Sequence, residues 1–156
     1  MPRNSETLHD YLDSNGIWHR FIEFSDLVKT VEQSAKKVPV ERIVKSIVMI
    51  ASNGDPLLAI VRAGDKVSFR KIKRLLSIKD VRLASPEEAT SGFPAGGVAP
   101  FTSITTVLLD PSVLTNQTCL VGGWDVNKLL EVMISDILEK VRPRIANIRD
   151  EREKGG

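Results

Sequence analysis

The sequence predicts a single domain of the mixed α/β class. With 156 residues the chain has the length of one domain, and its 42% apolar content is enough for one hydrophobic core without a disulfide or a metal. Six or seven short strand-like runs alternate with short helical patterns, and no internal repeat divides the chain. Such an alternation within one core is typical of a mixed α/β domain.

The N-terminal third is expected to form a helix, a strand and a second helix. Leucine and tyrosine recur at helical spacing between Ser5 and an Asn-Gly stop at 15–16, which predicts the first helix. Residues 17–24 are rich in aromatic and β-branched side chains and predict a strand. Thr30 and Gln33 form a capping box for a second helix that ends near residue 37.

The next segment predicts a β-hairpin followed by a basic helix. Residues 43–51 are too apolar for a half-exposed strand, and an Asn-Gly-Asp-Pro turn leads into a second strand at 57–62. Residues 67–76 show a helical pattern, with apolar side chains on one face and basic side chains on the other. The sequence therefore predicts a hairpin of two apolar strands followed by an amphipathic helix.

Shorter elements follow. A strand is expected at 81–83, and the segment Ser85–Glu88 is a second capping box with proline in the first turn of its helix. Residues 104–109 are rich in threonine and valine and predict a strand. Residues 118–121 predict another strand, which breaks at a Gly-Gly pair.

The C-terminal elements are less clear. Residues 128–134 fit a helix or a strand; a strand is favoured, with Ser135 capping a helix from about 136 to 141. Charges alternate at the end of the chain and two glycines close it. The sequence therefore predicts a domain over residues 1–148 and a frayed tail over 149–156.

Composition narrows the chemistry. Cys119 is the only cysteine, so no disulfide framework or thiolate metal site is expected; it is read as a small buried hydrophobe, with a catalytic thiol as the alternative. His9 and His19 have no carboxylate or cysteine at ligand spacing, so no metal is expected either. The absence of a leader pattern and of a membrane-length apolar run predicts a cytoplasmic protein.

Basic residues gather in one stretch. The net charge is only +2, but the segment from Arg62 to Arg82 contains eight basic residues and only two acidic ones. Such a cluster can hold phosphates in a salt-dependent way. It can equally be the solvated face of a helix, and the sequence leaves both interpretations open.

Lys45 interrupts an otherwise apolar strand. A lysine in that position must extend to solvent, pair with an anion or face a cavity. Burial favours the neutral amine, whereas a bound anion or a developing oxyanion favours the ammonium, and either state serves catalysis. The alternative is a lysine that points out of one face at a sheet edge.

The segment 92–101 (GFPAGGVAPF) carries no charge, three glycines and two prolines. A backbone freed by glycine and fixed by proline can bring bare N–H groups against a ligand; a buried connection is the alternative.

Asp110 is expected to cap a turn, with binding as the less common role. The chain lacks a serine elbow, a Walker loop and a dinucleotide fingerprint, so an enzyme of this sequence would use water as its nucleophile.

Taken in order, these segments resemble one known family. The resemblance rests on residues 30–35, the lysine strand at 44–48, the segment 62–67 before the basic helix, and the loop 92–101. The pattern resembles the YbaK family, which includes the editing domain of bacterial prolyl-tRNA synthetase and its free-standing relatives. The likeness covers roughly residues 5–148.

The resemblance implies a mostly antiparallel, barrel-like β-sheet flanked by short helices, and an aminoacyl-tRNA deacylase that needs no cofactor. The family hydrolyses the ester that joins a wrong amino acid, commonly alanine or cysteine, to the proline tRNA. Lys45 matches the family's lysine and Gly96–Pro100 its Gly-x-x-x-Pro loop. By this likeness Lys45 would anchor the terminal adenosine and stabilise developing charge, while backbone N–H groups at Gly96, Gly97 and Val98 would orient the carbonyl.

The resemblance also implies a substrate pocket and partners. The pocket residues expected from it are Thr30, Ser46, Val98, Pro100, Phe101, Gly122 and Gly123. Ser46 stands where the family often has threonine, and Thr102 where glycine is frequent. The expected partners are the aminoacylated 3′ end of tRNA and prolyl-tRNA synthetase; the chain is a monomer or a homodimer. Contacts to tRNA are expected from Lys66, Arg70, Lys73 and Arg74.

Two other functions fit the same residues. A non-catalytic RNA-binding module with this fold would bind tRNA in a salt-dependent way and deacylate nothing. A small-molecule-binding protein would use the same pocket, and a thermal-shift screen of aminoacyl-adenosine analogues against free amino acids would separate it from the deacylase.

Overall fold

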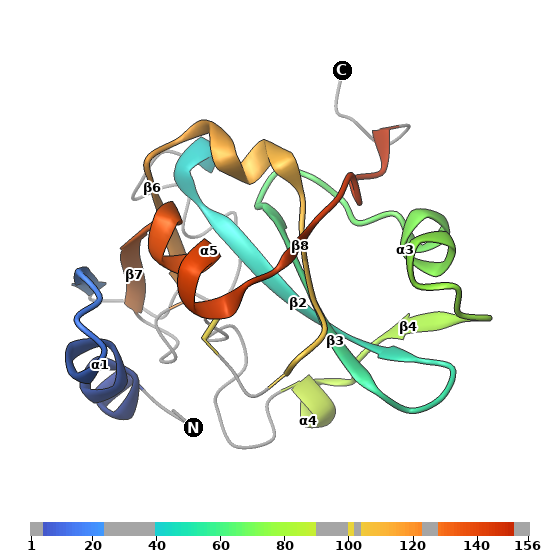
Figure 1. The fold of residues 1–156 in the computed structure, drawn as a ribbon, viewed down its shortest axis with the longest axis horizontal. Helices are drawn as coiled ribbons and strands as arrows, with labels where there is room; N and C mark the ends of the chain where they lie inside the picture. Colours follow the sequence, from blue (N-terminus) through green and yellow to red (C-terminus); the bar gives the residue numbers. More distant parts are fainter. Residues whose placement is uncertain (1–4, 24–39, 90–99, 102–103, 123–127, 152–156) are drawn as a thin grey trace.

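The computed structural model describes residues 5–23, 40–89, 100–101, 104–122 and 128–151. These residues build two β-sheets (Figure 1). The first is antiparallel, in the order β1 (His19–Glu23), β7 (Lys128–Met133) and β6 (Thr118–Gly122). The second is mixed, in the order β4 (Val81–Leu83), β2 (Val44–Ala51), β3 (Pro56–Arg62), β5 (Val107–Leu109) and β8 (Arg144–Ile145). This is the mixed α/β class that the sequence predicts.

The predicted hairpin, β2–β3, is confirmed and lies inside the second sheet. Its strands pair antiparallel from Val44 opposite Arg62 to Ile50 opposite Pro56. In the turn, Asn53 Oδ1 accepts a hydrogen bond of 2.9 Å from the backbone N–H of Asp55. Gly54 has φ +91°, a conformation that favours glycine. Local turn chemistry therefore sets the register of the central strands.

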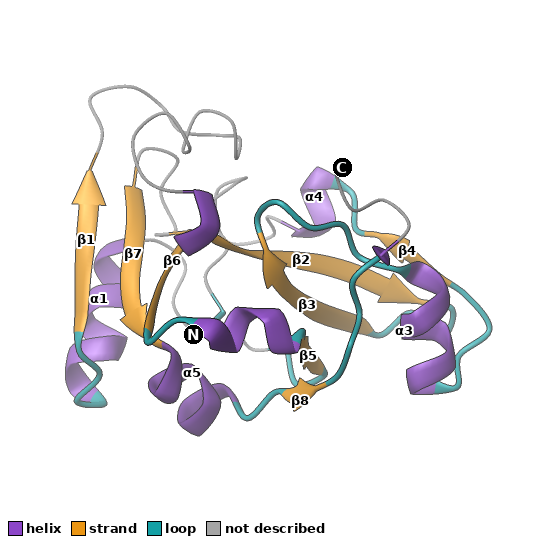
Figure 2. Cartoon of the chain, turned by 90° about the horizontal axis from the view of Figure 1, so that it is seen from above, coloured by secondary structure: helices purple, strands orange, loops and turns teal. Residues whose placement is uncertain are grey.

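The two faces of the hairpin pack against different layers. Because side chains alternate along a strand, Val48, Leu58 and Ile60 face a core shared with the first sheet. Met49 and Val61 face a second core, which α3 (Phe69–Leu76) covers. Figure 2 shows the hairpin between β1-β7-β6 on one side and α3 on the other. A parallel bridge between Ile43 and Leu120 joins the two sheets, so they curve around the shared core as a barrel would.

Helices and 3-10 helices connect the strands, and those that carry Leu12, Val113 and Ile137 pack against the shared core. They are α1 (Ser5–Ser14), α4 (Pro86–Ala89), α5 (Ile134–Val141), and the 3-10 helices at Val40–Arg42 and Pro111–Thr115. The capping box of α4 is confirmed in both directions. Ser85 Oγ accepts from the N–H of Glu88 at 3.1 Å, and the Glu88 carboxylate accepts from the N–H of Ser85 at 2.8 Å.

The predicted start of α5 is wrong. Ser135 does not cap the helix: the helix begins at Ile134, Met133 occupies the cap position, and no side chain makes the cap hydrogen bond. The start of the helix is set by a contact with another segment of the chain: the N–H of Ile134 donates to the carbonyl of Gln117 at 3.0 Å. The strand predicted at 128–134 is confirmed over Lys128–Met133. The helix predicted over 30–37 lies outside the described residues.

The last described residues are bound to the domain. The N–H of Asp150 donates to the carbonyl of Lys66 at 2.7 Å, and Arg149 pairs with Asp110 at 3.2 Å. Residues 152–156 lie outside the described part, so the domain boundary at residue 148 stays a prediction. No helix in the described part of the chain is long and apolar enough to span a membrane.

A buried carboxylate joins the 3-10 helix before β2 to the first sheet. Glu131 on β7 accepts a hydrogen bond of 2.7 Å from Arg42 and pairs with Arg20 at 2.7 Å. Arg42 also donates to Thr118 Oγ1 at 2.8 Å. Burial raises the pKa of Glu131, but the hydrogen bonds and charges of Arg42 and Arg20 outweigh it and hold the pKa below 4.5.

The variant Glu131→Gln tests this link through pH. Because the folded-state pKa is depressed, the charge stabilises the fold above pH 4.5, and this contribution is lost as the pH falls through the folded pKa. We expect the variant to lose about 1–3 kcal/mol of unfolding free energy at pH 7. Urea unfolding should show this difference shrinking below pH 4.5. A difference that stays constant into acid would contradict the ion pair.

Candidate functional site

Lys45 lies on β2, opposite Val61 of β3. β4 pairs only with Met49–Ala51, so Lys45 precedes the segment of β2 that has strands on both sides. Its side chain is half-buried rather than solvated. By strand alternation it shares a face with Ile47 and Met49.

The environment of Lys45 disfavours its charge. Burial lowers its pKa below 10.5; the carboxylate of Asp65 opposes this shift and the ammonium of Lys66 adds to it. Both residues belong to the turn between β3 and α3. Within the described residues, the Lys45 ammonium has no hydrogen bond and no ion pair. A ligand with negative charge would therefore supply the ion-pair partner that the described residues do not provide.

Ser46 does not share a surface with Lys45. Adjacent strand residues point to opposite faces, so Ser46 lies on the side of Val44 and Val48. Its Oγ is buried and has no hydrogen-bond partner in the described structure. A buried hydroxyl of this kind is unusual in a folded domain. The two neighbouring site residues therefore serve different sides of the sheet.

The end of the apolar loop is anchored in the core. Pro100 is buried, and Phe101 is 2% exposed and packs in the shared core. Its ring centroid lies 6.1 Å from that of Tyr11 on α1. At this end, the loop is therefore a buried connection, the alternative that the sequence left open.

The predicted site residues Thr30, Gly96, Gly97, Val98 and Gly123 lie outside the described residues; Gly122 ends β6 and is partly exposed.

The basic helix has two kinds of cation. Lys66, Arg70 and Arg74 are exposed and Lys73 is half-buried. Lys71 is already used inside the protein, because its ammonium donates to Asn147 Oδ1 at 3.1 Å and to the carbonyl of Arg149 at 2.8 Å. Part of the cluster is therefore structural and part faces solvent.

Asp110 and Cys119 have structural roles. Asp110 is fully buried, and its carboxylate accepts from the N–H and the Oγ of Ser112, at 3.0 and 2.6 Å. It thus caps the 3-10 helix at 111–115, as the turn-capping reading predicts. Burial raises the pKa of the Cys119 thiol to about 12, which confirms a buried hydrophobe and excludes a thiolate at neutral pH.

One contact had no signal in the sequence. His9 Nδ1 and His19 Nε2 lie 2.7 Å apart, although ten positions separate the two residues. His19 Nδ1 lies 2.9 Å from the carbonyl of Ile17 and must donate to it. Packing of α1 beside β1 brings the rings together. No third His, Cys, Asp or Glu of the described residues joins them as a metal ligand.

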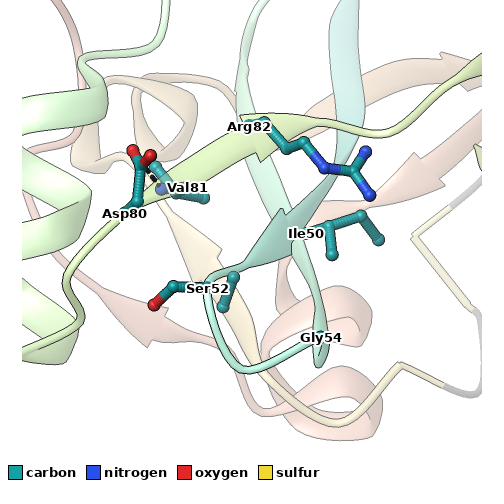
Figure 3. Close-up of a pocket in the computed structure, with 7 residues that line it drawn as sticks. Ile50, Ser52, Gly54, Asp80, Val81 and Arg82 are labelled. Atoms are coloured by element: carbon teal, nitrogen blue, oxygen red, sulfur yellow. Dashed lines mark hydrogen bonds between the residues drawn. The ribbon is translucent and has the colours of Figure 1, made fainter.

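A pocket of about 300 Å³ lies at the far end of β2 (Figure 3). Its lining comes from Ile50–Ser52, Gly54 and Asp80–Arg82. Ile50 lies five positions after Lys45 on the strand, about 16 Å away. The guanidinium of Arg82 is already paired with Glu88 at 2.7 Å. The pocket is therefore separate from the Lys45 site.

These features define a class: a small α/β domain with a half-buried cation on its central hairpin, unpartnered within the described ranges, and a partly solvated basic helix. The family model of the aminoacyl-tRNA editing domain matches residues 26–140, most of the chain. The chain therefore belongs to the aminoacyl-tRNA editing domain family, and its resemblance to the YbaK family is confirmed.

Relatives among curated proteins are proline–tRNA ligases. That of Solidesulfovibrio magneticus is 36% identical over 99 residues, which cover 60% of this chain and 17% of the ligase. That of Gloeobacter violaceus is 31% identical over 132 residues, which cover 70% of this chain and 22% of the ligase. The chain thus spans about a fifth of the length of these relatives.

Solved structures share the fold. One is a proposed trans-editing enzyme for prolyl-tRNA synthetase, with a TM-score of 0.83 and 23% identity, covering 96% of this chain and 99% of that one. Another is a hypothetical protein with a TM-score of 0.83 and 22% identity, covering 92% and 99%. At these identities the likeness establishes the fold.

The variant Lys45→Met tests the electrostatic state of the site. A lowered pKa means that the ammonium is less stable in the folded chain than in the unfolded chain. This penalty is present below the folded pKa and disappears as the pH rises from that pKa to 10.5. At pH 7 we expect a thermal midpoint equal to or above that of the wild type, with Lys79→Met as the exposed control. A clear loss of stability in Lys45→Met alone would show that the ammonium has a stabilising partner.

Proposed function

We propose that the chain is a trans-editing hydrolase that deacylates mischarged aminoacyl-tRNA. Its substrate is a small amino acid, such as alanine or cysteine, esterified to the proline tRNA. The observation that carries this proposal is the half-buried ammonium of Lys45, which none of the residues described here pairs with, in a domain of the editing family. The identity to proline–tRNA ligases supports the choice of tRNA.

In the proposed reaction, water attacks the ester carbonyl. A bond forms between the water oxygen and the carbonyl carbon, the bond to the ribose oxygen breaks, and the terminal adenosine leaves with a proton. Lys45 binds the phosphate or ribose region of that adenosine and stabilises the charge that develops near the ester. The N–H groups of Gly96, Gly97 and Val98 orient the carbonyl. A substrate hydroxyl assists the water, since the Cys119 thiol is buried and protonated.

Selectivity in this proposal comes from the size of the aminoacyl pocket. Walls from the loop ending at Pro100 and Phe101, with Thr30, Gly122 and Gly123, admit small side chains. Ser46 faces the other side of β2 from Lys45, so this proposal gives it no place in the wall. One methylene is worth only about 1–3 kcal/mol in an apolar pocket, so proline must be excluded by steric contact. The burial of Pro100 and Phe101 supports this role, because a wall that excludes by shape must be held in place.

The proposal includes the partners and the compartment. The acceptor stem of tRNA lies along the exposed cations Lys66, Arg70 and Arg74 with Lys73, and prolyl-tRNA synthetase supplies the mischarged product. The absence of a membrane-spanning helix in the described residues is compatible with the cytoplasm, where charged tRNA is used.

Lys45→Ala tests catalysis directly. Loss of the cation should reduce deacylation of alanyl- and cysteinyl-tRNA at least about 100-fold, the usual effect of removing a group that stabilises an oxyanion. Single-turnover release of the labelled amino acid measures the rate, and circular dichroism checks the fold. Lys79→Ala serves as the control for loss of one positive charge.

A wild-type rate in Lys45→Ala would refute the mechanism. A wild-type chain that binds tRNA in a salt-dependent way but deacylates none of a panel of mischarged tRNAs would instead identify the non-catalytic RNA-binding module.

The double variant Arg70→Gln/Arg74→Gln tests the tRNA surface. Each phosphate contact contributes about 0.7–0.9 to the slope of log K against log salt, so two lost contacts should reduce the slope by about 1.4–1.8. Lys71→Gln is the matched control on the same helix, because its ammonium is already bonded within the protein. An unchanged slope in the double variant would place the RNA elsewhere.

A further inference from the structure

The chain ends in an extended segment that crosses the molecule. This segment, residues 144–151, is called the strap. It begins with β8 at the edge of the second sheet and runs toward the end of the chain beside α3 (Figure 1). It lies beyond residues 26–140, which the family model matches. The strap is therefore a part of this chain whose role the family match leaves open.

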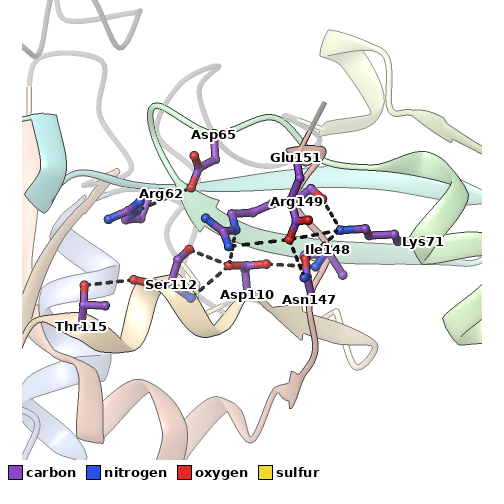
Figure 4. Close-up of polar contacts among 10 residues, drawn as sticks. All are labelled: Arg62, Asp65, Lys71, Asp110, Ser112, Thr115, Asn147, Ile148, Arg149 and Glu151. Atoms are coloured by element: carbon purple, nitrogen blue, oxygen red, sulfur yellow. Dashed lines mark hydrogen bonds and ion pairs between the residues drawn. The ribbon is translucent and has the colours of Figure 1, made fainter. Parts of the chain in front are cut away.

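A buried carboxylate clamps the middle of the strap (Figure 4). Asp110 Oδ1 accepts from the N–H of Ile148 at 2.9 Å, and Asp110 Oδ2 pairs with Arg149 Nε at 3.2 Å. The N–H of Asp110 in turn donates to the carbonyl of Ile60 on β3, at 3.0 Å. The strap is thus fixed to the central hairpin, through a side chain with no exposure to solvent.

The clamped strap then holds the turn before α3, residues 63–68. The N–H of Ser68 donates to the carbonyl of Ile148 and the N–H of Asp150 to the carbonyl of Lys66, both at 2.7 Å. Val67 and Arg149 form an antiparallel bridge between these two bonds. Main-chain bonds therefore fix the C-terminal half of the turn, and these bonds do not depend on the turn's side chains.

This turn carries the charges that act on Lys45. Asp65 raises and Lys66 lowers the pKa of the Lys45 ammonium. Coulomb energies at short range change steeply with distance, so the effect of both residues depends on where the turn is held. The turn follows directly on β3, whose Val61 lies opposite Lys45, and the N–H of Ala63 donates to the carbonyl of Ile43 at 2.9 Å. The bonds from Asp110 through the strap therefore reach the turn beside the strand pair that carries Lys45.

We propose that the strap is a positioning element of the Lys45 site: clamped by Asp110, it holds the turn at 63–68 so that Asp65 and Lys66 keep their places beside the ammonium. The electrostatic coupling can be measured by itself. Its consequence for hydrolysis rests on the proposed function. Asp110, Ile148 and Arg149 are positioning residues, because they act on Lys45 only through the turn.

A matched pair of variants at one position tests the coupling. Asp150→Pro removes the N–H that donates to Lys66, whereas Asp150→Ala keeps that N–H and removes only the carboxylate. Asp65→Asn is added to the wild type and to each Asp150 variant. The pKa of Lys45 is then measured by NMR at its side-chain nitrogen, whose resonance is assigned by its loss in Lys45→Met. This double-mutant cycle isolates the action of Asp65 on Lys45.

In the wild type and in Asp150→Ala, Asp65→Asn should lower the pKa of Lys45, because the attraction of the carboxylate is lost. In Asp150→Pro the same substitution should lower it by less than half as much. Equal effects in the proline and alanine backgrounds would overturn the proposal, since the turn would then hold its place without the strap.

If Asp150→Pro does not fold, a second variant tests the same coupling. Asp110→Asn with Arg149→Gln removes both charges of the clamp and leaves no uncompensated buried charge. It should also weaken the effect of Asp65→Asn on Lys45 by at least half, and a full effect would overturn the proposal.

Activity separates this inference from the proposed function. Deacylation by Asp150→Pro should fall about tenfold in kcat relative to Asp150→Ala, which lacks the same carboxylate, with KM for tRNA within twofold between the two variants. A wild-type kcat in Asp150→Pro would overturn the positioning role. A wild-type chain without deacylase activity that still shows the loss of coupling would refute the proposed function and support the strap.

Discussion

The site depends on a positive charge that the fold holds half-buried and that has no partner among the residues the structure describes. Burial at Lys45 lowers the pKa of the ammonium, and only the carboxylate of Asp65 opposes that effect. Such a charge persists only where the surrounding structure is strongly determined. Here β2 pairs with β3 along its whole length, and apolar layers cover both faces of the hairpin. The free energy lost at one lysine is offset by the apolar packing of the other residues of this hairpin, β3 above all.

The buried acids of the described residues differ from Lys45, because each of them has partners of opposite charge. Glu131 lies between Arg20 and Arg42, and Asp110 accepts hydrogen bonds from two segments besides its ion pair with Arg149. These paired acids link the 3-10 helix before β2 to the first sheet, and the strap to the central hairpin. The contrast explains why they are structural, whereas Lys45, which the described protein does not satisfy, is the group that can bind a substrate anion.

Local signals made most of the fold predictable. The Asn-Gly turn set the hairpin, and the capping box of α4 was correct in both of its hydrogen bonds, because each depends on residues within four positions. The start of α5 was wrong because the carbonyl of Gln117, from another element, replaced the expected cap. Lys45 was found because a charge in an apolar strand is itself a local signal. The clamp between Asp110 and Ile148 joins residues 38 positions apart, and no spacing in the sequence marks it.

The central claim is that the Lys45 ammonium receives its partner from the aminoacylated end of tRNA. The most direct test is an NMR titration of its side-chain nitrogen with an acceptor-stem RNA that carries amide-linked alanine, which cannot be hydrolysed as the ester is. Binding should shift the Lys45 resonance in a saturable way and raise its pKa, because the ligand supplies the negative charge that the described protein lacks. Binding that is visible at other resonances but leaves the signal and the pKa of Lys45 unchanged would contradict the claim.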